Sequence, residues 1–330
     1  MIRDPDALAD EVLAGSRRAL GQAITLVEST RADDRAAGDR LLTKLSPHSG
    51  RSIRLGISGV PGVGKSTFIE RFGLHVIDCD HRVAVLAVDP SSALSGGSIL
   101  GDKTRMGELS RSLEAFIRPS PAGRTLGGVT RHTRETMVLV EAAGFDVVIV
   151  ETVGVGQSET AVAEMTDMFL LLLQPGGGDE LQGIKRGIVE LADLVVVNKA
   201  DGDMAAAAQR SAADYAAALR FLRARSAQWQ VPVQTCSALT GEGIEAVWET
   251  VARYRDTMTQ GGELASRRAS QARAWLWSET AENLLAHLRD DPTLAERLRE
   301  LEGAVASGNL APRVAARELV ATLWKEAKPS

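Results

Sequence analysis

The chain has 330 residues, of which 44% are hydrophobic and 25% are charged. These proportions are typical of a folded globular protein and exclude a disordered or fibrous one. The formal net charge of -5 provides no positive field for a polyanion, and no apolar run reaches the roughly 20 residues that span a bilayer. We therefore expect neither nucleic acid nor a membrane as a partner.

The two cysteines, Cys79 and Cys236, lie far apart and lack the paired spacing of a zinc or redox site, which fits a reducing compartment. The first residues also lack the charged and apolar regions of a secretory signal. Both features predict a cytoplasmic protein.

Residues 1–50 are predicted to form an N-terminal helical extension. Between residues 4 and 46, apolar side chains recur at helical spacing with charges between them, which indicates two or three amphipathic helices. The turn-rich stretch Ser46–Gly50 ends this region.

Residues 51–260 show the pattern of an α/β domain, in which short apolar runs alternate with helical stretches. The runs are Ile53–Ser58, Val83–Val88, Val147–Val150, Phe169–Leu173, Leu194–Val197 and Val231–Thr235. Near-continuous apolar strands that alternate with helices indicate a parallel sheet covered on both faces. We therefore predict a doubly wound, mainly parallel sheet.

Residues 261–330 return to helical periodicity, with Trp275 and several leucines at spacings of three and four. Such an apolar stripe needs a surface to pack against, either on the rest of the chain or on a second copy. We predict a C-terminal helical segment that forms a homodimer.

A phosphate-binding loop follows the first apolar strand. Gly59–Thr67 matches G-x-x-x-x-G-K-[ST] between a strand and a helix, as a P-loop NTPase requires. Glycines let backbone N–H groups point at phosphate oxygens, and the helix N-terminus adds its positive dipole end. We expect Lys65 to reach the β- and γ-phosphates and Ser66 to ligate Mg²⁺. The predicted nucleotide contacts of this loop are Gly59, Gly62, Val63, Gly64, Lys65, Ser66 and Thr67.

Two motifs further along the chain predict selection of guanine. Asn198-Lys199-Ala200-Asp201 follows an apolar strand and resembles the N-K-x-D of GTPases. An Asp carboxylate accepts hydrogen bonds from N1–H and the N2 amino group of guanine, a donor pair that adenine lacks. Ser237-Ala238-Leu239 follows the next strand and resembles the S-A-x loop, whose backbone N–H contacts guanine O6. The predicted base contacts are Asn198, Lys199, Asp201, Ser237, Ala238 and Leu239.

Acidic residues near strand ends are candidates for a magnesium site. Glu151-Thr152-Val153-Gly154 ends a strand where many GTPases carry Asp-x-x-Gly, so we assign Glu151 to the outer shell of the metal and Gly154 to the γ-phosphate. Asp89 directly follows another strand and is placed for a magnesium contact. Asp102 lies in a glycine-rich stretch, where it holds metal, orients the attacking water, or is a solvated loop acid.

Val155 follows Gly154 where many small GTPases place the glutamine that orients the attacking water, although Gln157 is near. We therefore expect slow intrinsic hydrolysis or dependence on another group. The loop Gln174–Lys185 contains three consecutive glycines, whose ordering costs entropy that a plain turn need not incur. We interpret this loop as a switch that senses a partner, with a plain loop as the alternative.

Four strings together resemble one family. They are V-D-P-S-S at Val88–Ser92, G-D-K-T-R-M at Gly101–Met106, E-T-V-G-V-G-Q-S-E at Glu151–Glu159 and Q-P-G-G-G-D-E-L-Q-G-I-K at Gln174–Lys185. They resemble the MeaB/ArgK group of G proteins, the chaperones of methylmalonyl-CoA mutase. The resemblance spans residues 50–245 and includes flanking helices of the expected kind.

The resemblance implies a GTP-hydrolysing chaperone that gates adenosylcobalamin loading of the mutase from an adenosyltransferase and protects the mutase from inactivation. It places Ser66, Asp89, Asp102 and Glu151 at the metal and switch positions of the family, and Lys185 at the end of its extra switch loop. It also implies dimerisation through the C-terminal helices. The predicted catalytic residues are Lys65, Asp102 and Lys185, with Mg²⁺ as cofactor and GTP or GDP as bound nucleotide.

Three other functions stay open. A metallochaperone GTPase for metal-centre assembly would need His or Cys clusters, which the scattered histidines and two distant cysteines do not suggest. A small-molecule kinase with the same loop would need an acceptor pocket and no guanine selectivity; the family also carries an older label of a transport-linked ATPase or kinase. A scaffold would bind nucleotide without turnover.

Overall fold

The computed structural model describes residues 4–29, 31–88, 106–119, 126–152, 158–176, 186–221 and 225–326. Four of the predicted site residues, Asp89, Asp102, Gly154 and Lys185, lie outside these ranges, as does Gln157. The phosphate loop, both guanine motifs and Glu151 lie within them.

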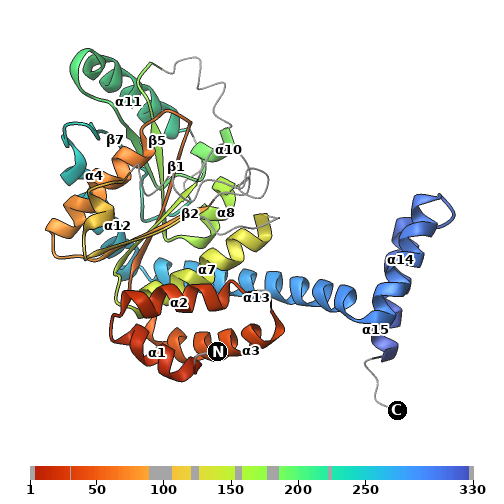
Figure 1. Ribbon diagram of the computed structural model, residues 1–330. Helices are drawn as coiled ribbons and strands as arrows, with labels where there is room; N and C mark the ends of the chain where they lie inside the picture. The colour runs from red at the N-terminus through yellow and green to blue at the C-terminus, as the bar shows by residue number, and fades with distance from the viewer. Residues whose placement is uncertain are drawn as a thin grey trace. The chain divides into compact units, whose positions relative to one another are not determined.

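A seven-stranded parallel sheet forms the centre of the fold (Figure 1). Its strands are β1 (Ile53–Gly59), β2 (Val83–Val88), β3 (Ala115–Arg118), β4 (Val147–Thr152), β5 (Met168–Leu173), β6 (Leu194–Val197) and β7 (Val233–Thr235). Their order is β3-β2-β4-β1-β5-β6-β7, and every neighbouring pair is parallel. The predicted parallel sheet is confirmed, and one short edge strand, β3, is added to it.

Helices cover both faces of the sheet because neighbouring residues of a strand point to opposite sides. Ile149 of β4 belongs to a core with α4 (Lys65–Asp78) and α12 (Ile244–Gln260), whereas Val148 and Val150 belong to a core with α7 (Leu126–Ala142) and α8 (Ser158–Met165). A third cluster joins β5 and β6 to α11 (Ala205–Leu219). The short helix α10 (Arg186–Val189) precedes β6, and η1 (Ser46–His48), η2 (Leu109–Arg111) and η3 (Gly202–Met204) are single 3₁₀ turns. The doubly wound arrangement is confirmed.

Three helices precede the sheet, as the apolar spacing predicts. They are α1 (Pro5–Leu13), α2 (Arg17–Val27) and α3 (Ala32–Leu45). The Ser16 hydroxyl accepts a hydrogen bond from the Ala19 N–H at 3.3 Å and caps α2, since the first N–H groups of a helix have no partner within it. All three helices contact α7 and share its apolar core.

The chain continues into α13 (Glu263–Asp290), α14 (Pro292–Ala306) and α15 (Pro312–Glu326). The chain consists of two compact units, residues 1–268 and residues 269–330. Helix α13 begins in the first unit and ends in the second. Within the second unit α14 packs against α15, and Leu294 and Leu301 are buried. The helical C-terminus is confirmed, whereas the three-domain division and the dimer stay predictions. Searched over the described residues, no helix has the length and hydropathy to cross a membrane.

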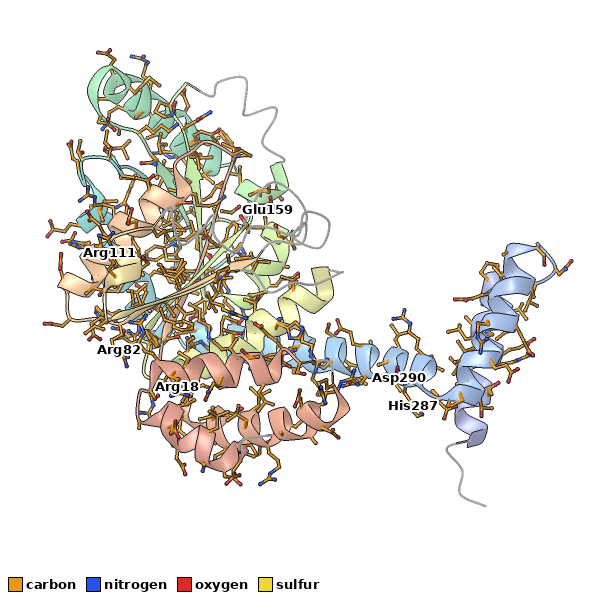
Figure 2. All side chains as sticks on the ribbon, in the orientation of Figure 1. Arg18, Arg82, Arg111, Glu159, His287 and Asp290 are labelled. Carbon is orange, nitrogen blue, oxygen red and sulfur yellow. The ribbon has the colours of Figure 1, made fainter. Side chains whose placement is uncertain are left out.

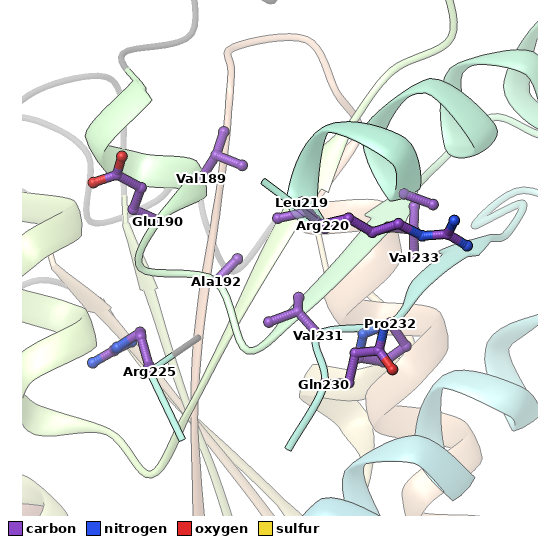
Figure 3. Close-up of a pocket in the computed structure, with 11 residues that line it drawn as sticks. Val189, Glu190, Ala192, Leu219, Arg220, Arg225, Gln230, Val231, Pro232 and Val233 are labelled. Atoms are coloured by element: carbon purple, nitrogen blue, oxygen red, sulfur yellow. The ribbon is translucent and has the colours of Figure 1, made fainter. Parts of the chain in front are cut away.

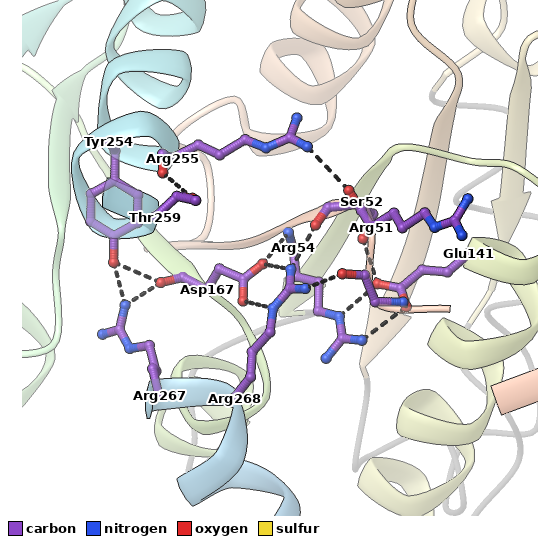
Figure 4. Close-up of polar contacts among 11 residues, drawn as sticks. Arg51, Ser52, Arg54, Glu141, Asp167, Tyr254, Arg255, Thr259, Arg267 and Arg268 are labelled. Carbon is purple, nitrogen blue, oxygen red and sulfur yellow. Dashed lines mark hydrogen bonds and ion pairs between the residues drawn. The ribbon is translucent and has the colours of Figure 1, made fainter. Parts of the chain in front are cut away.

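Two arginines attach the start of α13 to the sheet (Figure 4). Arg268 donates from Nε and Nη2 to the two carboxylate oxygens of Asp167, at 2.7 and 2.6 Å. Asp167 directly precedes β5 and is fully buried, and its carboxylate also accepts the Arg54 backbone N–H at 2.8 Å. Arg267 lies 3.3 Å from Asp193, which directly precedes β6. The amino ends of two neighbouring strands are thus tied to one helix.

Replacing Arg268 with alanine is expected to lower the free energy of unfolding by about 3–5 kcal/mol, because it leaves the Asp167 carboxylate buried without its bidentate partner. Chemical denaturation followed by circular dichroism measures the loss. Arg210→Ala, at an exposed position of α11, is the matched control and is expected to change stability by less than about 0.5 kcal/mol. Equal losses in the two variants would contradict the role given to Arg268.

Candidate functional site

The predicted nucleotide motifs meet at one edge of the sheet, the edge formed by the carboxyl ends of the parallel strands. Gly59 ends β1 and begins the phosphate loop, Val197 ends β6 directly before Asn198, and Thr235 ends β7 two residues before Ser237. Ligands of open parallel sheets bind at this edge, where neighbouring strands connect to helices on opposite faces. Segments that are far apart in the sequence are therefore close in space here.

The phosphate loop has the backbone that its glycines predict. Gly62 and Gly64 have φ values of 81° and 88°, in the left-handed region that other residues rarely adopt, and α4 begins at the next residue, Lys65. A Cβ at Gly59 would lie 2.6 Å from the Leu172 carbonyl oxygen, and one at Gly64 would lie 2.9 Å from the Asn198 amide nitrogen. Glycine is required at both positions because neighbouring segments approach so closely.

Lys65 lies between the phosphate loop and two buried carboxylates. Its Nζ donates to the Gly59 carbonyl at 3.2 Å. Burial lowers the pKa of the Lys65 ammonium, and the charges of Glu151 and Glu159 act in the opposite direction. The net effect is a lowered pKa, so burial outweighs the two acids.

Asn198 connects all three nucleotide motifs. Its amide nitrogen donates to the Val63 carbonyl in the phosphate loop at 2.9 Å, and its amide oxygen accepts the Ala238 N–H at 2.9 Å. The Cys236 thiol lies 3.6 Å from the same oxygen, and burial raises its pKa to about 12, so the thiol stays neutral. Asn198 therefore holds the phosphate loop and the S-A-L loop in one rigid arrangement.

Lys199 and Asp201 continue the N-K-x-D motif beyond Asn198. The Lys199 Nζ donates to the Gly62 carbonyl at 2.7 Å, and its φ of 61° turns the chain away from β6. Asp201 is half-buried, and no hydrogen bond from the described residues reaches its carboxylate. In the S-A-L loop the Ala238 N–H is used by Asn198, whereas the Leu239 N–H has no hydrogen-bond partner within the described ranges. Among the described residues of these two motifs, the Asp201 carboxylate and the Leu239 N–H are free to accept and donate hydrogen bonds.

Glu151 is the one predicted acidic metal residue that lies within the described ranges. It is buried near the end of β4, level with Ile57 of β1 and Ala87 of β2. The next residue, Thr152, shares a 2.9 Å hydrogen bond with Ser58 that joins β4 to β1 below the phosphate loop. Within the described part of the chain, no three His, Cys, Asp or Glu side chains are grouped as metal ligands.

The model of the family described as methylmalonyl-CoA mutase-associated GTPase MeaB matches residues 20–293. The chain belongs to the MeaB family.

Relatives of the chain carry names that agree with this family. A Caulobacter vibrioides protein with a GTPase name is 56% identical over 96% of this chain and 97% of its own length. GTPase ArgK of Escherichia coli is 48% identical over 92% of each chain. The mitochondrial methylmalonic aciduria type A homolog of mouse is 50% identical over 94% of this chain and 77% of its own. These similarities make the chain a P-loop GTPase with guanine nucleotide as its ligand.

A solved structure confirms the fold across the chain. It is titled LAO/AO transport system kinase, is 39% identical and has a TM-score of 0.76. The similarity covers 98% of this chain and 99% of that one. This structure confirms the predicted P-loop NTPase fold. The family and its relatives confirm the predicted GTPase activity.

Sequence reasoning missed Glu159 as part of this MeaB-family site. Glu159 lies in the first turn of α8, is 3% exposed, and acts on the charge of Lys65. It ends the string Glu151–Glu159, so the family resemblance contained it, but no pairing with the lysine was visible in the sequence. This electrostatic effect depends on how α8 packs against the sheet.

A separate cavity of about 420 Å³ lies at the opposite edge of the sheet (Figure 3). Its walls include Ala192, Leu219, Val231 and two arginines, Arg220 and Arg225. Ala192 and Val231 precede β6 and β7, whereas the nucleotide motifs follow these strands. The cavity is therefore no part of the predicted nucleotide site.

Proposed function

We propose that this GTPase is a chaperone of methylmalonyl-CoA mutase that gates adenosylcobalamin loading and protects the mutase from inactivation. The observation that carries the proposal is the match of residues 20–293 to a family described by its association with that mutase. The mouse relative, named for methylmalonic aciduria type A, supports it. An adenosyltransferase is the proposed source of the cobalamin, and the cytoplasm is the proposed location.

In this proposal the nucleotide lies along the carboxyl edge of the sheet. Lys65 contacts the β- and γ-phosphates, while Asp102 and Lys185 contribute to hydrolysis from the two switch segments. Asp201 accepts from the guanine edge. The further nucleotide contacts proposed are Gly59, Gly62, Val63, Gly64, Ser66, Thr67, Gly154, Asn198, Lys199, Ser237, Ala238 and Leu239.

Mg²⁺ is the proposed cofactor, and the residues present fit it. The Ser66 hydroxyl in the first turn of α4 and the buried Glu151 carboxylate are the oxygen donors that Mg²⁺ prefers. Asp89 and Asp102 are the further proposed ligands. When bound, Mg²⁺ would neutralise charge on the phosphates.

A homodimer formed through the C-terminal helices is also proposed. Leu276 and Trp277 of α13 are 65% and 73% exposed, and Leu284 and Leu285 further along the helix are about half exposed. Large apolar side chains in such a run are more stable when another surface covers them, and a second copy would supply that surface.

The test is GTP turnover by the purified chain, alone and with methylmalonyl-CoA mutase added. A rise of about tenfold or more, equal to about 1.4 kcal/mol of barrier, is expected. Lys185→Ala and Asp102→Ala are then compared by how much of the mutase-induced rise in GTP turnover each removes. Arg210→Ala is the control and is expected to keep the full rise. If the mutase leaves the rate of GTP hydrolysis unchanged while GTP still binds, the chain is still a GTPase, but the mutase is not its activator.

A small-molecule kinase is the second candidate, because the 39% identical structure has a kinase title. A kinase would use ATP and transfer phosphate to an acceptor. Competition of ATP against GTP for binding separates the two, since Asp201 is expected to favour guanine. ATP binding as tight as GTP binding would support the kinase.

A further inference from the structure

The tip of the phosphate loop is a tight turn. The Val63 N–H donates to the Val60 carbonyl at 3.2 Å, which closes a four-residue turn with Pro61 and Gly62 at its centre. Gly62 has a φ of 81°. Proline at the second position and a positive φ at the third are the features of a type II β-turn. The residues at the tip of the loop therefore suit the turn that they form.

Side chains from the guanine motif hold the second half of this turn. The Lys199 Nζ donates to the Gly62 carbonyl at 2.7 Å, and the Asn198 amide nitrogen donates to the Val63 carbonyl at 2.9 Å. In the described part of the chain, no hydrogen bond reaches the Pro61 carbonyl. The shape of the first half therefore depends on its own residues.

Proline stiffens that first half. Its ring fixes φ at about −65°, which is close to the value that the second position of a type II turn requires. The ring also restricts the preceding residue to extended conformations, and here that residue is the β-branched Val60. Two neighbouring residues of the tip thus have few conformations available besides the one in the turn.

Pro61 has neither of two other roles that a residue of this loop could have. Side chains of the covering helices fill both faces of the sheet (Figure 2), but Pro61 is exposed and packs into no core. It also lacks a backbone N–H and cannot donate to a phosphate oxygen. The N–H groups of Gly62 and Gly64, by contrast, have no partner among the described residues and are available to phosphate. Pro61 therefore contributes shape to the loop, without a hydrogen bond of its own.

We propose that Pro61 is a positioning residue that keeps the nucleotide-free phosphate loop in its binding shape, so that GTP and GDP bind without first ordering the tip. When only a fraction of the free protein has the competent shape, the apparent dissociation constant rises by the inverse of that fraction. Removing the proline gives the nucleotide-free loop more conformations and lowers that fraction. The inference rests on the proposed nucleotide site and is independent of the mutase partner.

The test compares Pro61→Ala with Pro47→Ala, a matched control at an exposed position of the 3₁₀ turn η1. A fluorescent GDP analogue is mixed with the nucleotide-free chain in saturating Mg²⁺, and stopped flow measures association, then release after excess unlabelled GDP is added. Pro61→Ala is expected to bind about two- to fivefold more slowly and to release at the unmodified rate, because it acts on the nucleotide-free loop. Pro47→Ala is expected to leave both rates unchanged.

Pro61→Gly extends the series, because glycine has the least restricted backbone. Association is expected to slow in the order Pro, Ala, Gly, with the glycine variant about 4- to 25-fold below the unmodified chain. A melting temperature close to that of Pro47→Ala shows that each variant is folded. A residue that touched the nucleotide would change release instead, so faster release from Pro61→Ala, or association as fast as in the unmodified chain, would overturn the proposal.

Lys65→Ala in the same assay separates this inference from the site on which it rests. If Lys65→Ala binds the GDP analogue weakly while Pro61→Ala associates at the unmodified rate, the loop is the nucleotide site and only the inference about Pro61 fails. If Lys65→Ala binds and releases the analogue as the unmodified chain does, the proposed nucleotide site fails as well.

Discussion

Lys65→Ala is expected to reduce kcat/KM for GTP about a thousandfold, close to 4 kcal/mol of transition-state stabilisation. Phosphoryl transfer is catalysed mainly by positioning and by charge, and Lys65 is the cation that the phosphate loop provides. Its ammonium is partly desolvated, and burial lowers its pKa against the charges of Glu151 and Glu159. Charge interactions are stronger in such a site than in water. Phosphate release under single-turnover conditions measures the loss.

Two further variants test whether the loss belongs to this lysine. Lys44→Ala removes a lysine of α3 that pairs with Asp10 at 2.6 Å, and it is expected to leave GTP turnover unchanged. Lys65→Arg keeps the charge but not the compact ammonium, and it is expected to restore little activity. If Lys65→Ala kept more than a tenth of the normal kcat/KM, the lysine would have no major part in the transition state.

Asp201→Asn is expected to weaken GTP binding about 10²- to 10⁴-fold. Two hydrogen bonds to a charged carboxylate contribute about 1.5–3 kcal/mol each, and the amide cannot accept both guanine donors. Xanthine carries a carbonyl where guanine carries its N2 amino group, so the Asn variant is expected to prefer xanthosine triphosphate. Titration of both nucleotides against both proteins measures the change of preference.

Asp203→Asn is the matched control for this experiment. Asp203 lies two residues further along in the 3₁₀ turn η3 and is exposed, so its neutralisation tests the effect of local charge alone. Its GTP affinity is expected to stay within about twofold of normal, as for exposed charges in general. Equal weakening by the two variants would show that Asp201 does not read the base.

The local patterns of the sequence predicted most of the sheet. Six of the seven strands were indicated by apolar runs, with boundaries that differ from the structure by up to two residues. The missed strand, β3, has only four residues and lies at the edge of the sheet, and three of its four positions are half-buried. A continuous apolar run is the sign of a strand covered on both faces, so a short edge strand gives a weak signal.

The phosphate loop and the guanine motifs were predictable because each is a short string whose residues act on the same ligand. Their mutual contacts were not predictable in this way. Asn198 reaches Val63 and Ala238, at sequence separations of 135 and 40 residues. Nothing in the order of residues indicates that the asparagine side chain joins the two loops.

The sequence by itself determined the class of the protein, since strand periodicity, the P-loop and N-K-A-D each depend on residues close together in the chain. Only the tertiary structure decided what surrounds Lys65. The charge of Glu159 acts on Lys65, 94 residues away in the sequence, since α8 packs against β1 and β4. Charge interactions depend on distance through space and on burial, and the packing of the sheet and its helices sets both.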